Sequence, residues 1–124
     1  MLSISCPLGE SSKRFSIYSM RTKPGEVWLT DLGIAEKTRP ILIVSREDSD
    51  PPRALVIRVP LTTKNRFSRY EVDLGKLPFL REPSVANVQG LASIPVARLP
   101  RRIGEVSGEM LAQVKEALRF ALDL

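Results

Sequence analysis

The sequence predicts one small, mainly β domain that is closed by a single helix. Three observations lead to this fold class: several short apolar or alternating runs, turn residues between them, and one amphipathic stretch at the C-terminal end. The runs lie too close together for the crossovers that parallel strands need. Short antiparallel strands with one terminal helix favour a strongly bent β-barrel. A chain of 124 residues is expected to form one core.

The first half of the domain is predicted to contain three strands. Lys23–Gly25 is a turn signal, and residues 26–32 then alternate as in a strand with one buried face. Within that run, Trp28 is expected in the core rather than on a nucleic-acid surface. Residues 41–45 predict a strand covered on both faces. After a polar loop with two prolines, residues 54–60 predict the third strand.

The second half is predicted to contain three more strands. Residues 69–74 alternate again, and residues 85–89 form a short strand for which an extension to Ser93 is left open. Residues 94–100 hold two prolines and predict a turn or a short 3₁₀ segment. Residues 101–106 complete the sheet.

The C-terminal end predicts a helix that Ser107 caps and that carries Glu109 in its first turn, where the helix dipole favours a negative charge. An apolar stripe at spacings of three and four should pack the helix on the sheet. It consists of Leu111, Val114, Leu118 and Leu122, flanked by Ala117 and Ala121.

Residues 1–22 differ from the rest of the chain. They are rich in serine and show no period, which predicts a disordered tail ahead of a domain at 23–124. Met20 offers an alternative start that would remove most of this tail.

The amino-acid composition excludes several kinds of catalytic and metal-binding site. The chain has no histidine, which excludes a Ser-His-Asp triad and removes the commonest metal ligand. Its one cysteine, Cys6, allows no internal disulfide and makes a poor zinc site even with carboxylates. We therefore expect no metal and no cofactor. No stretch approaches the roughly 20 apolar residues of a membrane span, and no secretory signal is visible, so we expect a cytoplasmic protein.

The charge balance favours an anionic partner. Nineteen Lys and Arg face 14 Asp and Glu, for a formal charge of +5. Such a chain suits nucleic acid or an acidic protein segment. The alternative is a charge that only keeps the domain dispersed.

Five segments follow one another in an order typical of a known family. They are KPGEVWLTDLG, TRPILIVS, VPLTTK, SVANVQGL and RLPRRIGEVSGEMLAQVKEALRFAL. Over residues 22–124 the chain resembles the MazF/PemK family of toxin endoribonucleases. This resemblance implies an SH3-like barrel, usually a homodimer, that cleaves single-stranded RNA without a metal and leaves a 2′,3′-cyclic phosphate and a 5′-OH. It also implies a small acidic antitoxin, similar to MazE or PemI, as partner.

The resemblance gives roles to three residues. The family's arginine before the second strand falls on Arg39, its threonine after the third strand on Thr62, and its RNA-binding glutamine on Gln89. RNA supplies its own nucleophile, so a protein need only position the 2′-OH and stabilise the charged transition state. An arginine fork and a threonine hydroxyl both suit phosphate oxygens. Because an arginine side chain keeps its proton in proteins, Arg39 is expected to stabilise charge, with general-acid catalysis as a second role, and no base is assigned.

Neighbouring residues are expected to contact the RNA. They are Glu36, Lys37, Thr63, Lys64 and Arg66. Each position also has a plainer interpretation: Arg39 as a solvated turn residue, Thr62 as part of a turn, Gln89 as an ordinary strand residue, and the cations as a solvated rim.

The segment GIAEKTRP is shorter than the corresponding loop of the family, and Glu36 is its only acid. In the family that loop normally covers the RNA groove, so its shortening is expected to affect which RNA sequence is cleaved. It also motivates a second hypothesis, a non-catalytic RNA- or protein-binding module on the same barrel. A gyrase-inhibiting toxin of related fold ranks third, because Arg39 and Thr62 match the RNA-cleaving pattern.

Overall fold

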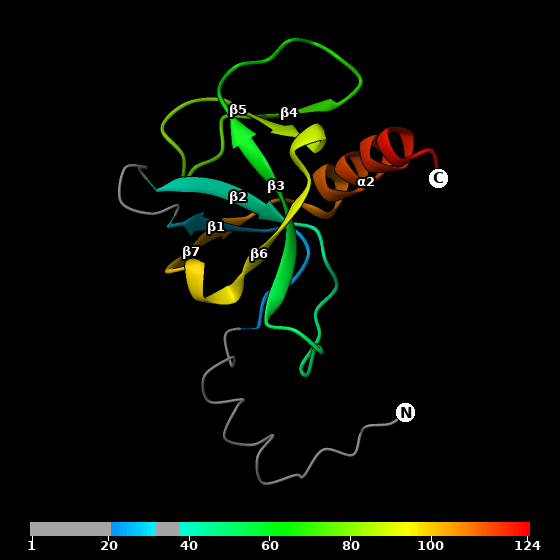
Figure 1. Ribbon diagram of the computed structural model, residues 1–124. Helices are drawn as coiled ribbons and strands as arrows, with labels where there is room; N and C mark the ends of the chain where they lie inside the picture. Colours follow the sequence, from blue (N-terminus) through cyan, green and yellow to red (C-terminus); the bar gives the residue numbers. More distant parts are fainter. Residues whose placement is uncertain (1–20, 32–37) are drawn as a thin grey trace, which may run out of the picture.

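The computed structural model describes residues 21–31 and 38–124 (Figure 1). The predictions for residues 1–20 and for Glu36 and Lys37 therefore lie outside the described residues. The elements follow the order β1 (Glu26–Thr30), β2 (Arg39–Ile43), β3 (Leu55–Thr62), β4 (Glu71–Gly75), β5 (Ser84–Asn87), η1 (Val88–Gly90), β6 (Ala92–Pro95), η2 (Val96–Arg98), β7 (Arg101–Glu105) and α2 (Gly108–Leu122). In this part of the chain no helix is long and apolar enough to cross a membrane.

The strands form one antiparallel sheet that curls into a half-barrel (Figure 1). Its order is β4-β5-β3-β2-β1-β7, and β6 pairs separately with β3. Strand β3 is the centre of this arrangement, because its first half pairs with β6 and its last two residues pair with β5. The mainly β fold with one terminal helix is thus confirmed.

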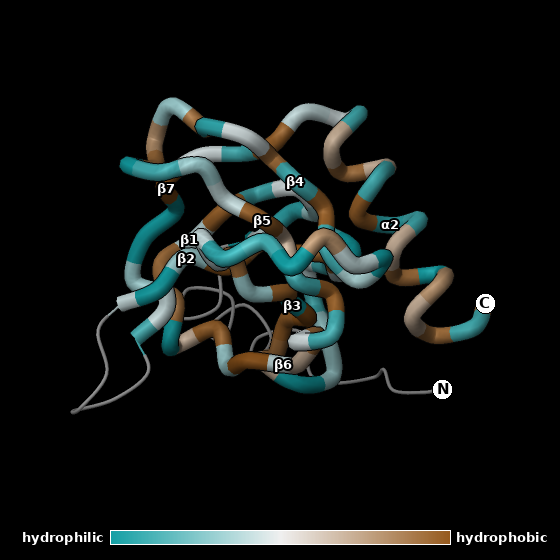
Figure 2. Tube along the Cα trace, turned by 90° about the horizontal axis from the view of Figure 1, so that it is seen from above, coloured by the Kyte–Doolittle hydropathy of each residue, from teal (hydrophilic) through white to brown (hydrophobic). Residues whose placement is uncertain are grey.

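Two apolar clusters lie on opposite faces of the central strands, as the two-residue period of a strand requires. The larger one packs against α2, which lies along one side of the sheet (Figure 2). The smaller one includes Trp28, which is 6 % exposed, so its core placement is confirmed. Its other members are Ile41, Ile43, Val56, Ile94, Val96 and Leu99.

Helix α2 begins as the sequence predicts. The Ser107 hydroxyl oxygen accepts a hydrogen bond from the Met110 amide at 3.1 Å, and Val114 is fully buried. The prediction is wrong for Leu122, which is 51 % exposed. This residue ends the helix, where the last turn projects beyond the strands in Figure 1.

Three predicted boundaries are wrong in ways that matter for the site. Strand β2 begins at Arg39 rather than at residue 41, and β3 continues to Thr62, so both residues lie inside strands. Residues 85–93 are not one strand, because the Asn87 side chain accepts a hydrogen bond from the Gln89 amide at 3.1 Å and starts the 3₁₀ turn η1. The 3₁₀ segment expected within residues 94–100 is found as η2.

Candidate functional site

A groove opens where β2 lies beside the second half of β3. Its first part has a cavity volume of about 450 Å³ and is lined by Thr30, Arg39, Pro40, Ile41, Arg58, Pro60, Leu61, Thr62, Thr63, Ser84 and Asn87. A second hollow of about 520 Å³ is lined by Thr62, Lys64, Arg66, Ser68, Tyr70, Glu71, Asn87 and Gln89. The two parts share Thr62 and Asn87, so they are continuous. We call the whole surface the basic groove.

Strand register brings the two residues predicted as catalytic together. Pro60 of β3 lies opposite Ile41 of β2. Continuing this register by two residues sets Thr62 opposite Arg39. On the other side of β2, Arg39 is paired with Thr30. Arg39 and Thr62 therefore both stand on strand backbone rather than in a turn.

Arg58 is a groove residue that sequence reasoning missed. It is half-buried, and its Nη1 donates a hydrogen bond to the Gly90 carbonyl at 3.3 Å. The Nε of Arg58 is buried and has no hydrogen-bond partner among the described residues, and the same is true of the Thr30 hydroxyl oxygen. Buried polar groups normally have a hydrogen-bond partner, so these two atoms are exceptions among the described residues around the groove. A lone charge within the apolar run ALVIRVP was the signal that could have revealed Arg58.

The turn η1 closes tightly onto β3 because residue 90 is glycine. A Cβ on Gly90 would lie 2.5 Å from Cγ of Pro60, a distance that real side chains do not reach. The absence of a side chain lets the Gly90 carbonyl approach β3 and accept the hydrogen bond from Arg58. Gly90 therefore holds the guanidinium in place at the groove floor.

The Thr62 hydroxyl serves the local turn and the groove at once. Its oxygen accepts a hydrogen bond from the Lys64 amide at 3.2 Å, which is the turn interaction considered as an alternative. A hydroxyl also carries one proton to donate. That proton remains available to an acceptor in the groove.

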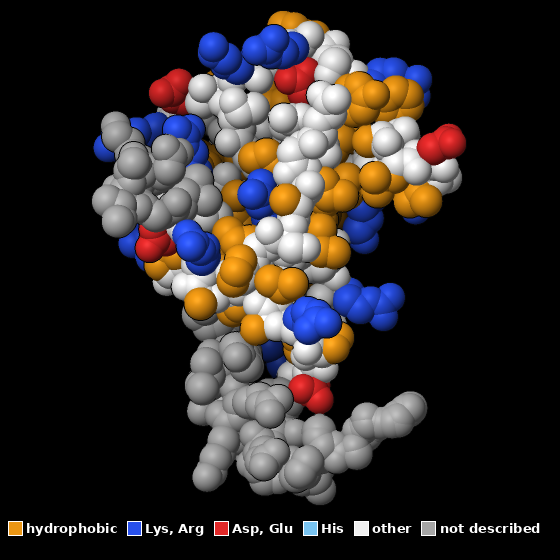
Figure 3. All heavy atoms as spheres, in the orientation of Figure 1, with side chains coloured by type: hydrophobic (Ala, Val, Ile, Leu, Met, Phe, Trp, Pro, Cys, Tyr) orange, Lys and Arg blue, Asp and Glu red, His pale blue; other side chains and the backbone are white. Residues whose placement is uncertain are grey.

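The loop between β3 and β4 is fastened by one carboxylate. Glu71 accepts hydrogen bonds from the Ser68 amide at 3.0 Å, the Ser68 hydroxyl at 2.8 Å and the Arg66 amide at 3.1 Å. The Ser68 bonds, and then those to Arg66, hold the pKa of Glu71 below its usual value of 4.5. The exposed cations Lys64 and Arg66 thus stand on an ordered loop, over which Lys and Arg side chains gather at the top of Figure 3.

Two other arginines serve the fold instead. The Arg69 guanidinium carbon lies 3.8 Å from the centre of the Phe120 ring, which joins the loop to α2. Arg102 forms an ion pair with Glu26 at 3.1 Å, which ties β7 to the start of β1. Neither residue lines the basic groove.

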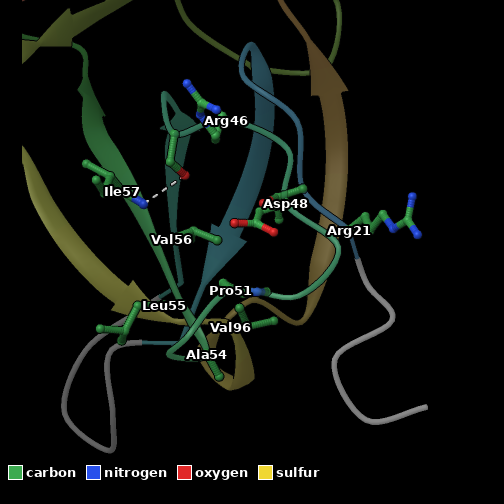
Figure 4. A pocket seen from close by; sticks show the side chains of 11 residues that line it. Arg21, Arg46, Asp48, Pro51, Ala54, Leu55, Val56, Ile57 and Val96 are labelled. Carbon is green, nitrogen blue, oxygen red and sulfur yellow. Dashed lines mark hydrogen bonds between the residues drawn. The ribbon is translucent and has the colours of Figure 1, made fainter. Parts of the chain in front are cut away.

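A smaller hollow of about 150 Å³ lies beside the first half of β3 and shares no residue with the groove (Figure 4). Apolar side chains such as Val56, Ile57 and Val96 line most of it, together with the carboxylate of Asp48. In Figure 4 the Arg21 side chain points away from this hollow. Its polar lining also includes Arg21, Arg46, Thr22 and Ser45. The described residues also contain no group of three or more Cys, Asp or Glu that could hold a metal ion.

The structure places six of the eight predicted site residues along one continuous surface. Arg39, Thr62 and Thr63 line its first part, and Lys64, Arg66 and Gln89 line its second part, with Thr62 common to both. The remaining two, Glu36 and Lys37, are outside the residues that the structure describes. The polar lining residues of the first part that the sequence did not single out are Asn87, Ser84, Thr30 and Arg58.

Comparison with protein families gives a match over residues 23–122 to the PemK-like, MazF-like toxin of type II toxin-antitoxin systems. Two curated relatives come from Mycobacterium tuberculosis. The chain is 35% identical to endoribonuclease MazF3 over 89 residues, which are 72% of this chain and 86% of the relative. It is 32% identical to endoribonuclease MazF9 over 112 residues, 81% of this chain and 95% of the relative.

Solved structures agree with these relatives. The Mycobacterium tuberculosis toxin MazF-mt6 superposes with a TM-score of 0.70 at 32% identity, covering 80% of this chain and 97% of that one. An endoribonuclease in complex with its cognate antitoxin, from a mycobacterial species, gives a TM-score of 0.72 at 29% identity, covering 83% and 96%. Both likenesses cover at least four-fifths of this chain.

Proposed function

Because the chain belongs to the PemK/MazF family of toxins of type II toxin–antitoxin systems, we propose that it is an endoribonuclease that cleaves single-stranded RNA in the basic groove. The observation that carries this proposal is the donor set of the first part of the groove. Its described lining holds two guanidinium groups, Arg39 and Arg58, with hydroxyl and amide side chains and no carboxylate. Such a surface attracts a phosphodiester and repels no part of it.

The proposed reaction is an internal transesterification. The RNA 2′-oxygen forms a bond to the adjacent phosphorus, the bond from phosphorus to the 5′-oxygen breaks, and the 2′-OH proton is balanced by protonation of the leaving oxygen. The products are a 2′,3′-cyclic phosphate and a 5′-OH. Arg39 and the Thr62 hydroxyl stabilise the extra negative charge of the phosphorane, and Arg58 supports it from the groove floor. This route requires no metal ion.

The second part of the groove holds the RNA on one side of the scissile phosphate. Lys64 and Arg66 supply positive charge there, and Gln89 supplies both a donor and an acceptor for a base edge. The same cations suit a small acidic antitoxin that covers the groove, and one solved relative is described as bound to its cognate antitoxin. We further propose a homodimer that acts in the cytoplasm, where messenger RNA is found.

The decisive experiment is cleavage of a long unstructured RNA in EDTA by the wild-type protein and by Arg39→Ala. We expect the wild type to cut and the variant to be slower by at least about 100-fold, the usual cost of removing one group that stabilises transition-state charge. Arg53→Ala is the matched control, because Arg53 is also exposed but lies before β3 and does not line the groove.

Two results would contradict the proposal. If wild-type protein binds the RNA but never cuts it, the chain is a binding module on this fold. If RNA stays whole while supercoiling by gyrase is inhibited, the target is the topoisomerase. Mass spectrometry of the new 3′ ends tests the mechanism separately, because a 3′-phosphate or a 3′-hydroxyl formed directly would exclude the cyclic intermediate.

A further inference from the structure

We propose that Phe67 is a stacking platform for a nucleobase at the outer end of the basic groove. This inference rests on the proposed function, because it adds a binding position to the same RNA path. Phe67 is 86 % exposed, the most exposed large hydrophobic residue together with Leu124 among the described residues. An aromatic ring in that position contributes almost nothing to the core. We therefore look for its role in binding another molecule.

The backbone at Phe67 is in a conformation that a phenylalanine does not favour. Its φ is +58°, in the left-handed region that glycine and asparagine adopt easily and bulky residues avoid. Phe67 and the helix-capping Asp123 are the only non-glycine residues with positive φ in the described part of the chain. Strain of this kind persists where the surroundings impose it and is typical of binding sites.

The surroundings of Phe67 do impose this conformation. The Asn65 side-chain oxygen accepts a hydrogen bond from the Phe67 amide at 2.7 Å. On its other side, Glu71 holds the amides of Arg66 and Ser68 at 3.1 and 3.0 Å. The loop therefore fixes the backbone of Phe67 on both sides, which means that the ring is presented to solvent by an ordered support.

The neighbours of Phe67 favour RNA over a protein partner. Arg66 and Ser68 both line the second part of the groove, so the backbone of Phe67 lies at its edge. Lys64 of the same loop also lines the groove, and Figure 3 shows hydrophobic atoms beside Lys and Arg at the top of the molecule. A basic track with an aromatic ring beside it is the arrangement by which proteins bind single-stranded nucleic acid: cations follow the phosphates and the ring takes a base.

The test measures binding of a labelled, non-cleavable 2′-O-methyl RNA to the wild type, Phe67→Tyr, Phe67→Leu and Phe67→Asn. Tyrosine keeps the ring, leucine keeps apolar bulk without a ring, and asparagine tolerates the left-handed backbone. We expect wild-type affinity for Phe67→Tyr and a loss of about 5- to 100-fold for the other two, the effect of one lost base stack. Thermal melting should show that Phe67→Asn is at least as stable as the wild type, so the loss cannot come from unfolding.

Salt dependence separates stacking from charge. A stacking residue shifts the affinity by the same factor at every salt concentration. Lys64→Ala, in contrast, should reduce the slope of log affinity against log salt by about 0.7, the value for one phosphate contact on a single strand. If Phe67→Leu binds the RNA as tightly as the wild type, the ring is not a stacking platform.

A second outcome would also overturn the inference. If the Phe67 variants bind RNA normally but lose affinity for an acidic antitoxin, the ring is a protein contact. The non-cleavable RNA keeps this test independent of the proposed activity, because base stacking is then measured even if the wild type cuts nothing. Conversely, intact cleavage with unchanged binding in all three variants would reject the Phe67 site and leave the endoribonuclease proposal standing.

Discussion

The two halves of β3 bury opposite faces. In the first half Val56 is buried at 8 % exposure, whereas Leu55 and Ile57 on the other face are 41 % and 43 % exposed. In the second half the order is reversed, since Val59 and Leu61 are buried at 0 % and 7 %. The face that carries Val56 continues as Arg58, Pro60 and Thr62, which line the basic groove.

This reversal shows how a small half-barrel makes room for a site. The first half of β3 is covered by the smaller apolar cluster, and the second half is covered on its other face by the cluster that packs on α2. One face of the second half is thereby released from core packing. Polar and charged residues can occupy it at little cost to stability, on a backbone that neighbouring strands hold on both sides.

The largest expected effect tests burial with a matched pair, Leu61→Ala and Leu55→Ala. The two leucines lie on the same face of β3, but only Leu61 is buried. We expect Leu61→Ala to lower the free energy of unfolding by about 2–5 kcal/mol, as for other buried leucines, and Leu55→Ala to cost less than about 1 kcal/mol. Urea unfolding measures both. Equal losses would mean that the two halves of β3 are covered alike.

The next effect concerns charge, with Arg58→Ala compared to Arg46→Ala. Arg58 lines the groove, whereas Arg46 lines the smaller hollow beside the first half of β3. Arg58 is proposed to support the charged transition state, so removing it should lower kcat/KM for RNA cleavage by about 100-fold, and Arg46→Ala should leave kcat/KM unchanged. Arg58→Lys should recover only part of the activity, because lysine lacks the planar fork that reaches both Gly90 and a phosphate.

If Arg46→Ala reduces cleavage as strongly as Arg58→Ala, the two arginines act only through the overall positive charge of the protein. The position of Arg58 in the groove would then have no role of its own. Measuring both variants at low and high salt makes this distinction, since a general field is screened and a buried contact is not.

A smaller effect is expected from a single hydroxyl. Thr62→Val keeps the shape of the side chain and removes its donor, so the rate of the chemical step should fall by about 10-fold, the value of one hydrogen bond to a charged group. Thr62→Ser retains the hydroxyl and serves as the control. Single-turnover cleavage rates give the comparison. If Thr62→Val cleaved RNA at the wild-type rate, the Thr62 hydroxyl would have no part in the reaction and would serve only the turn.

The smallest effect concerns pH and the loop that follows β3. Hydrogen bonds lower the pKa of Glu71 in the folded protein below 4.5. The ionised Glu71 side chain therefore stabilises the fold fully at any pH above its pKa in the unfolded chain. This stabilisation is lost as the pH falls through the lower pKa that Glu71 has in the folded protein. The difference in unfolding free energy between wild type and Glu71→Gln should be constant from pH 7 to 5 and shrink below about pH 4.5. A difference that grows on acidification would mean that the carboxylate destabilises the loop.

Local patterns were enough to predict most of this fold. Alternation located the strands, and Ser107 located the start of α2, because both signals depend on residues close in sequence. The family resemblance directed attention to Arg39 and Thr62, which the structure places on one surface. The strand ends were misjudged by about two residues, since pairing across the sheet, which no local pattern reports, extends β2 and β3.

The features that were missed depend on contacts between distant residues. Arg58 lies within an apolar strand, and only the folded chain shows that its guanidinium donates a hydrogen bond to the Gly90 carbonyl. Likewise, Phe67 was unremarked because exposure and a positive φ are properties of the folded loop. The break between β5 and β6 depends on which stretch of β3 each of them pairs with.

Gly90 has a consequence for how this site can change over generations. Every substitution at that position adds an atom that collides with Pro60, so η1 would have to move away from β3 and take the acceptor of Arg58 with it. Residues on the groove rim, such as Lys64 and Gln89, carry no such constraint and can be exchanged one at a time. In the RNA site proposed above, substitutions on the rim can therefore change which RNA sequence is bound, whereas Gly90 keeps the floor of the groove unchanged.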